Sequence, residues 1–421
     1  MSSVTTPARA SLDRRLGLGD AVFIGLGSMI GAGVFAAYAP AARAAGTGLL
    51  VGLAVAAVVA YCNATSSAQL AAAYPRAGGT YLYGREVLGD WWGYLAGWGF
   101  MVGKTASCAA MALTFAAYAA PDGWLRPVAV AVVVVLTLVN CAGVTRTAVL
   151  TRVLVSLVLV SLVIAAVACL RGGSSSELSG WASPDGGVYG VLQSAGLLFF
   201  AFAGYARIAT LGEEVREPER VIPRAIVLAL AGAVVVYAVI AVAVLSVLGG
   251  PGTAASAAPV ADAVGATSSD TVVGVVRVGA ALASAGALLA LVAGLGRTGL
   301  AMAREHDLPG WLDAVHPRFR VPHRAELTVS AVVVVLVLTT DLRGAIGFSS
   351  FGVLLYYFVA NASAYRQPAG ARRFPRWLQL LGCAGCLVLV ATLPWHSVVA
   401  GITVFVIGIA VRAIRLSLLR R

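Results

Sequence analysis

Apolar residues in this chain gather in long runs, and short connections that contain arginine separate these runs. A run of about 17 to 25 apolar residues is long enough to cross a bilayer as an α-helix. We predict about twelve such spans, near residues 19–40, 46–73, 91–119, 127–141, 149–171, 188–211, 222–248, 271–303, 325–340, 344–364, 376–394 and 397–417. The pattern therefore predicts an all-α integral membrane protein that is embedded in the lipid bilayer.

The composition agrees with this membrane setting. The chain is 60% hydrophobic and 11% charged, whereas a soluble domain carries roughly 25% charged residues. The formal net charge of +12 could suggest a nucleic-acid partner, but the distribution of the charge argues against one. Basic residues gather in every second connection, and the other connections hold only Arg43, Arg126, Arg171 and Arg343. Because positive charge marks cytoplasmic connections, both termini are predicted to be cytoplasmic.

Neither a metal site nor a cofactor is expected. The six cysteines lie within or at the ends of apolar spans. Cys383 and Cys386 form a C-x-x-C motif without a nearby histidine or acid, so we interpret them as small packing residues. The four histidines lack the spacing of metal ligands.

The first span is unusually rich in glycine. Residues 27–35 read G-S-M-I-G-A-G-V-F, and Gly25 precedes them. Gly27 and Gly31 could form a face for close helix packing, whereas a phosphate-binding loop would need a preceding strand that the sequence does not predict. In a third interpretation, the glycines through Gly33 interrupt the helix. Unwound backbone at that depth is tolerated only where it lines a cavity, so it would bind a ligand. This stretch alone leaves packing and ligand binding open.

A second irregular span lies near residue 200. Residues 199–207 read F-F-A-F-A-G-Y-A-R, with Gly204 in the middle of the span. Interrupted helices at matching positions of two halves are the best sequence indication of a transporter's binding site. The pair therefore favours the ligand-binding interpretation. The segment near 222–248 is almost wholly valine, alanine, leucine and isoleucine, and we interpret it as scaffold.

Charged residues inside the spans are further candidates for function. Lys104 is the only lysine and lies midway along the third span, where a charge costs about 2.5–3.5 kcal/mol on insertion scales. It either faces a cavity or partner, or is a structural residue that binds helix carbonyls. Arg207 either is a second intramembrane charge or reaches the cytoplasmic vestibule. Glu213 and Glu214 lie beside several arginines, which is more typical of a cytoplasmic salt-bridge network or gate than of proton carriers.

Four stretches together resemble the amino acid–polyamine–organocation transporter superfamily. They are residues 27–35, A-Q-L-A-A-A-Y-P-R-A-G-G-T-Y-L-Y at 68–83, the segment 199–226, and R-T-G-L-A-M-A-R-E-H-D-L-P at 297–309. The resemblance covers nearly the whole chain and implies a leucine-transporter-type 5+5 inverted repeat with broken helices 1 and 6. The implied parts are a cytoplasmic tail (1–18), the first repeat (19–171), the second repeat (188–364) and two additional helices (376–417).

The resemblance also implies a substrate site at the two broken helices. It places an amino acid's carboxylate on the backbone N–H groups of Ala32 and Gly33, at the start of a half-helix. It places the α-amino group on the carbonyls of Met29, Phe200 and Ala203. Phe200 also matches an aromatic gate, and Lys104 matches a substrate-lining position. The candidates for coupling or gating are Lys104, Tyr205, Arg207, Glu213 and Glu214.

Three departures from the superfamily pattern bear on the substrate. Ala206 and Gln69 stand where relatives often carry an acid, and Val158 stands where one proton-coupled branch carries a lysine. These changes remove negative charge from the core and leave Lys104. A cationic substrate side chain would find no carboxylate there, so the pattern favours a neutral or acidic amino acid.

These features predict a plasma-membrane permease that moves an amino acid by alternating access. Proton-coupled uptake is the leading form, with the proton as coupling ion, and an amino acid or amine exchanger or exporter is the alternative. A non-transporting amino acid sensor is the alternative from another class. An enzyme is not expected, because the sequence presents no nucleophile–base pair or metal cluster.

Overall fold

The computed structural model describes residues 16–75, 78–143, 148–178, 185–211 and 214–419. In these ranges the chain folds into helices, and an isolated β-bridge joins Leu16 to Val215. The α-helices are α1 (Leu18–Met29), α2 (Gly33–Ala36), α3 (Tyr38–Ala45), α4 (Leu49–Ala73), α5 (Gly79–Leu88), α6 (Asp90–Ala119), α7 (Leu125–Cys141), α8 (Ala148–Gly172), α9 (Gly187–Phe202), α10 (Ala206–Ala209), α11 (Pro218–Ala255), α12 (Pro259–Gly265), α13 (Asp270–Arg304), α14 (His323–Thr339), α15 (Leu342–Arg366), α16 (Arg376–Thr392) and α17 (Trp395–Leu419).

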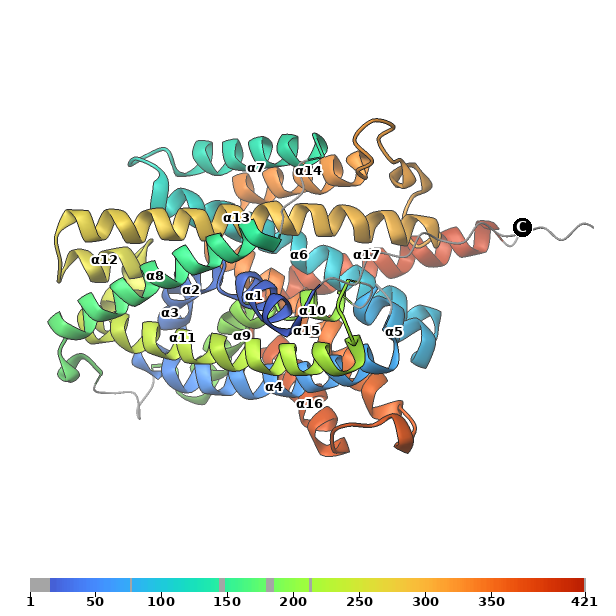
Figure 1. The fold of residues 1–421 in the computed structure, drawn as a ribbon, viewed down its shortest axis with the longest axis horizontal. Helices are drawn as coiled ribbons and strands as arrows, with labels where there is room; N and C mark the ends of the chain where they lie inside the picture. The colour runs from blue at the N-terminus through green and yellow to red at the C-terminus, as the bar shows by residue number, and fades with distance from the viewer. Residues whose placement is uncertain (1–15, 76–77, 144–147, 179–184, 212–213, 420–421) are drawn as a thin grey trace, which may run out of the picture.

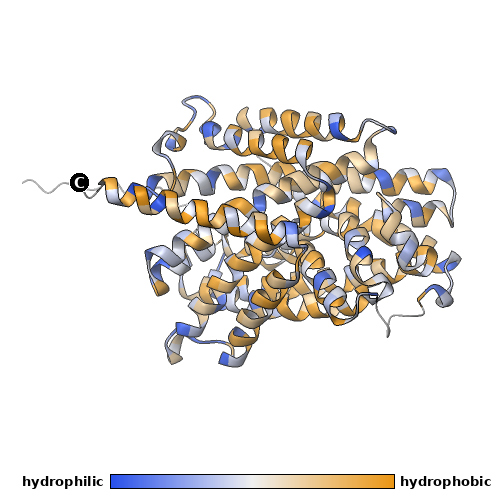
Figure 2. Cartoon of the chain, turned by 180° about the vertical axis from the view of Figure 1, so that it is seen from behind, coloured by the Kyte–Doolittle hydropathy of each residue, from blue (hydrophilic) through white to orange (hydrophobic). Residues whose placement is uncertain are grey.

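The apolar runs of the sequence become membrane-crossing helices. Eight stretches of the described chain are long and apolar enough to cross a membrane, and α7, α9 and α16 are shorter apolar helices. The eight stretches are Leu18–Ala36, Tyr38–Ala73, Asp90–Ala119, Val149–Gly172, Pro218–Ala255, Asp270–Arg304, Leu342–Arg366 and Trp395–Leu418. Hydrophobic residues follow the length of the helices, and hydrophilic residues gather at their ends (Figure 2). The protein is a multi-pass membrane protein.

The short and interrupted helices lie in the middle of the bundle. α1, α2, α9 and α10 occupy the centre, α11 and α4 run along one side, and α13 runs along the other with α14 and α7 beyond it (Figure 1). α12 and α5 lie at opposite ends of the bundle (Figure 1). The long helices therefore enclose the two interrupted ones.

α6 and α15 pack closely because small residues face each other. A Cβ atom on Gly352 of α15 would lie 2.7 Å from the Gly99 carbonyl oxygen and 2.9 Å from the Gly103 Cα of α6. The hydroxyls of Ser107 and Ser349 are 2.7 Å apart between the same two helices. Small residues and interhelical hydrogen bonds are what hold helices together in lipid, where no hydrophobic effect drives helix–helix packing.

Gln69, one of the departures noted in the sequence, has a structural role in α4. It is fully buried, and its amide nitrogen donates to the Gln367 side-chain oxygen at 2.6 Å. Its own oxygen accepts the backbone N–H groups of Arg373 and Phe374, each at 3.1 Å. A neutral amide satisfies these hydrogen-bonding groups without placing a charge in the interior. Through these hydrogen bonds Gln69 connects α4 to the segment between α15 and α16.

Candidate functional site

The first span is interrupted at Ile30, Gly31 and Ala32. α1 ends at Met29, Ile30 takes non-helical angles (φ −78°, ψ 40°), and α2 begins at Gly33. In the described chain, the backbone N–H groups of Gly31, Ala32 and Gly33 donate to no protein acceptor, although these residues are buried. Buried N–H groups without partners are rare, so these three are available to a ligand.

The sixth span is interrupted at Ala203, Gly204 and Tyr205. α9 ends at Phe202, and a turn leads into α10. The Arg207 N–H donates to the Gly204 carbonyl at 3.1 Å, which closes the turn. Both interruptions fall where the sequence placed a glycine in mid-span.

The two interruptions pack directly against each other. A Cβ on Gly33 would lie 2.7 Å from both the Cα and the Cβ of Ala201, in the last turn of α9. Reciprocally, a Cβ on Gly204 would lie 2.3 Å from the Ser28 carbonyl oxygen, in the last turn of α1. Each broken helix therefore uses a glycine to admit the backbone of the other.

The remaining glycines of span one have packing roles. Gly25 and Gly27 lie within α1 and not in the interruption, and a Cβ there would meet Ile208 at 2.3 Å and Val155 at 2.5 Å respectively. Gly31 does lie in the interruption, where a Cβ would approach the Ala287 Cβ of α13 to 2.8 Å. The glycine-rich stretch therefore contains both close-packing glycines and an interruption of the helix, and ligand binding by it stays a prediction.

Side chains from the surrounding helices satisfy the carbonyls that the interruptions free. The Tyr237 hydroxyl of α11 lies 2.6 Å from the Met29 oxygen and 2.9 Å from the Ala201 oxygen, so it bridges both broken helices. The Lys104 ammonium of α6 donates to the Ala203 carbonyl at 3.1 Å, and the Tyr357 hydroxyl of α15 donates to the same oxygen at 3.3 Å. These three carbonyls thus have protein donors, whereas the three N–H groups of the first interruption have no protein acceptor in the part of the chain that the structure describes.

Tyr237 is a site residue that the sequence interpretation missed, because the segment 222–248 was interpreted as scaffold. The available signal was a single tyrosine in a run of aliphatic residues. A hydroxyl in the middle of a span needs a hydrogen-bond partner, and the freed carbonyls of an interrupted helix provide one.

The predicted substrate-binding residues come together. Ala32 and Phe200 belong to one apolar cluster with Cys108, one turn beyond Lys104 on α6. Lys104 reaches Ala203 as described, and Met29 and Gly33 flank the first interruption. All six are buried, and Lys104 is only 8% exposed. This arrangement is closed to solvent.

The coupling and gating candidates other than Lys104 occupy different places. Arg207 of α10 has an exposed side chain that donates to the Thr210 hydroxyl at 3.1 Å. The vestibule and the intramembrane interpretations of this charge both stay predictions. Tyr205 is fully buried, with its ring 5.0 Å from that of Tyr357. The Glu214 carbonyl accepts the Leu16 N–H at 3.1 Å, and Glu213 lies outside the described residues.

A second polar cluster surrounds Asp307, just after α13. Its carboxylate pairs with Arg412 of α17 at 3.0 Å and with Arg85 of α5 at 3.2 Å, and it accepts the Tyr81 hydroxyl at 2.8 Å. Burial raises the pKa of Asp307, while the hydrogen bond from Tyr81 and the two arginines oppose that rise. Burial, and then Asp307, raise the pKa of Tyr81. This cluster ties α5 and α17 to the end of α13.

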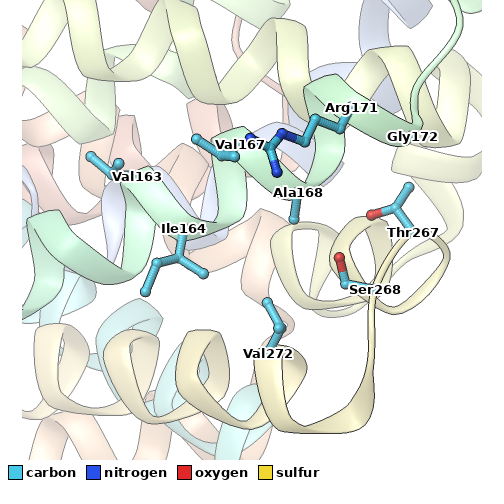
Figure 3. A pocket seen from close by; sticks show the side chains of 9 residues that line it. All are labelled: Val163, Ile164, Val167, Ala168, Arg171, Gly172, Thr267, Ser268 and Val272. Atoms are coloured by element: carbon cyan, nitrogen blue, oxygen red, sulfur yellow. The ribbon is translucent and has the colours of Figure 1, made fainter.

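A cavity of about 470 Å³ lies away from the interruptions, between the last turns of α8 and the turn that leads into α13 (Figure 3). Val163, Val167 and Val272 form its apolar wall, and Arg171 and Ser268 are among its polar lining residues. Val163 is 61% exposed, as expected for a lipid-facing side chain. This cavity includes none of the predicted site residues.

Comparison with known proteins identifies the family of this chain. Residues 16–412 match the amino acid permease family. An uncharacterized transporter of Mycobacterium tuberculosis (strain ATCC 25618 / H37Rv) is 60% identical over 410 residues, which cover 97% of this chain and 93% of that relative. The branched-chain amino acid permease BcaP of Bacillus subtilis (strain 168) is 25% identical over 439 residues, or 96% of this chain and 94% of BcaP. The chloroplastic cationic amino acid transporter 6 of Arabidopsis thaliana is 28% identical over 431 residues, or 95% of this chain and 74% of that protein.

The chain belongs to the amino acid permease family. The resemblance to the amino acid–polyamine–organocation superfamily is therefore confirmed. Members of this family are permeases and transporters and not enzymes.

Proposed function

We propose that this protein is a secondary active transporter that carries an amino acid across the plasma membrane by alternating access. The observation that carries the proposal is the reciprocal packing of two interrupted helices, with Gly33 against Ala201 and Gly204 against Ser28. Interrupted helices at the middle of the membrane, in corresponding positions of two halves, are typical of transporter binding sites. Relatives named for amino acid transport support an amino acid as the substrate.

The proposed architecture has twelve crossings with both termini in the cytoplasm. The first repeat comprises residues 19–171 and the second 188–364, each opening with an interrupted span, and residues 376–417 add two helices outside the repeats. The cytoplasmic tail comprises residues 1–18. The arginine-rich connections support this orientation.

In the proposed site the substrate carboxylate accepts the free backbone N–H groups of Ala32 and Gly33. The α-amino group uses the carbonyls of Met29, Phe200 and Ala203. The Met29 oxygen has one protein donor, Tyr237, and keeps a second lone pair. The Ala203 oxygen already accepts from both Lys104 and Tyr357, so the amino group would replace one of these two donors. Phe200 covers the substrate, and Lys104 lines the site, where it is the first candidate for coupling to protons.

Alternating access needs a moving part and a fixed part. The close contact between the two broken helices would make them move together, because neither glycine leaves space for independent sliding. The glycine-lined contact between α6 and α15 would be the fixed part, and Lys104 and Tyr357 would be its contacts with the moving part. Rocking of one bundle against another around a fixed site is the usual form of alternating access.

Uptake into proteoliposomes tests this proposal. Purified protein is reconstituted and given a panel of labelled amino acids, with and without an inward proton gradient. Accumulation driven by the gradient would establish proton-coupled uptake, and uptake only into vesicles preloaded with amino acid would establish an exchanger. Binding without flux in either arrangement would contradict transport and favour the sensor.

A further inference from the structure

Three arginines from distant parts of the chain meet at one cavity. The cavity has a volume of about 240 Å³, and its charged lining residues are Arg43 of α3, Arg126 of α7, and Asp341 and Arg343 at the start of α15. The proposed topology places this end of the bundle outside the cell. Three of the four arginines in the outer connections therefore line one small space, and only Arg171 lies elsewhere.

Neutral groups hold two of these arginines, so their charges are not cancelled. Arg43 Nε donates to the Ala254 carbonyl at 2.7 Å. Arg343 Nη2 donates to the Gln193 side-chain oxygen at 2.9 Å, and its Nε is buried without a partner. In the described part of the chain, none of the three guanidinium groups that line this cavity forms an ion pair with a carboxylate.

Asp341 does not balance this charge. Its carboxylate accepts the Gly344 N–H at 2.8 Å and so caps the N-terminus of α15. Three guanidinium groups thus face one carboxylate, and the cavity is positive. A cleft lined by one sign of charge concentrates small ions of the opposite sign.

Two of the helices that line the cavity, α3 and α6, also extend towards the candidate site. α3, which contributes Pro40 and Arg43, follows the short helix α2, and α2 begins directly after the first interruption. Leu113 of α6 also lines the cavity, and it is nine residues, or about 14 Å of helix, beyond Lys104. Lys104 is bound by the neutral Ala203 carbonyl, so its charge is also available to an anion.

We propose that this arginine-lined cavity captures a net anionic amino acid, one with a second carboxylate, and passes it to the site beside Lys104. This inference rests on the proposed transport function and specifies its substrate class. The volume suits a small solute, since sites for drug-sized ligands are larger, at about 300–1,000 Å³. A cationic side chain would meet like charge in the cavity and again at Lys104, and a neutral one would gain nothing from the three arginines.

Initial rates of uptake for a charge series test the substrate class. The probes are labelled glutamate, its neutral analogue glutamine, and arginine, with reconstituted wild-type protein at low and high ionic strength. Glutamate is expected to have the highest kcat/KM, and salt is expected to lower that value alone, because screening acts on charged substrates.

Substitutions of Arg126, whose side chain is exposed, test the cavity without disturbing the fold. Arg126→Gln should raise the KM for glutamate about threefold or more with little change in kcat, since a whole charged cleft contributes about 10- to 1,000-fold to association. Arg126→Lys keeps the charge and should restore the wild-type KM. Arg171→Gln removes the outer arginine that lies outside this cavity and serves as the matched control. Binding of labelled glutamate in detergent is measured for each variant.

The outcomes separate this inference from the proposed function. If glutamine or arginine is transported with a higher kcat/KM than glutamate, and Arg126→Gln does not change this, the anionic substrate class is wrong. The proposed transport function then stands. If glutamate binds, Arg126→Gln weakens this binding, and no probe is transported, the capture site is supported and the transport function is wrong. Neither binding nor flux of any probe overturns both.

Discussion

Replacing Tyr237 by phenylalanine tests whether one hydroxyl couples the two broken helices. The Tyr237 hydroxyl lies 2.6 Å from the Met29 carbonyl and 2.9 Å from the Ala201 carbonyl, one on each broken helix. All three residues are buried. Tyr237→Phe removes the hydroxyl and keeps the ring, which packs on Phe202 with centroids 5.0 Å apart. The two carbonyls then lose the donor that they share.

The size of the effect follows from the cost of a buried polar group without a partner. Such a group costs about 1–3 kcal/mol, and this amount changes an equilibrium about 5- to 150-fold. The cost falls on the state in which the two interruptions are packed together. We therefore expect Tyr237→Phe to lower both the thermal stability in detergent and the kcat/KM of uptake.

Tyr38→Phe is the matched control. The Tyr38 hydroxyl is also buried, and it donates at 2.9 Å to the backbone carbonyl of Tyr237, which is not part of either interruption. Both variants should lower thermal stability by similar amounts, but only Tyr237→Phe should lower the rate of uptake per folded molecule. Equal rates of uptake in the two variants would refute the coupling of the broken helices through this hydroxyl.

Three further substitutions probe other parts of the molecule. Gly33→Ala should abolish uptake while leaving expression largely intact, because the new Cβ would lie 2.7 Å from the Ala201 Cα; uptake and surface expression are measured together. Lys104→Met should change substrate selectivity or the pH dependence of uptake, because it removes the charge beside Ala203. Asp307→Asn should lower the stability by about 3–5 kcal/mol, because it leaves Arg412 buried without its ionic partner; thermal unfolding in detergent measures this.

The glycine and the aspartate substitutions each have a control within the chain. Gly294→Ala adds a Cβ with no atom within 4 Å and should be silent. Asp313→Asn breaks an exposed pair with Arg304 at 2.7 Å, and an exposed pair contributes only about 0–1 kcal/mol. Wild-type uptake by Gly33→Ala would contradict the reciprocal packing. Wild-type substrate selectivity and pH dependence in Lys104→Met would return this residue to a structural role. Equal stability of Asp307→Asn and Asp313→Asn would contradict the importance of the buried ion pair between Asp307 and Arg412.

The sequence alone was sufficient for the features that depend on neighbouring residues. Long apolar runs predict membrane helices because burial in lipid depends on local composition, and the helices lie where these runs do. The interruptions near Gly31 and Gly204 were predictable for the same reason, since glycine weakens a helix at its own position. The only lysine, Lys104, was recognisable as a candidate site residue because a charge in mid-span is costly wherever it lies.

The tertiary structure decided which distant groups meet. The Tyr237 hydroxyl reaches Met29 across 208 positions of sequence, and Asp307 meets Arg412 only because α17 packs against α6 and α15. Arg43, Arg126 and Arg343 look alike in the sequence, as isolated charges in outer connections, yet they line one cavity, whereas Arg171 lines another. Hydropathy determines which segments enter the membrane. It does not determine which faces of those segments touch, because close packing of small residues and individual hydrogen bonds between helices make that choice.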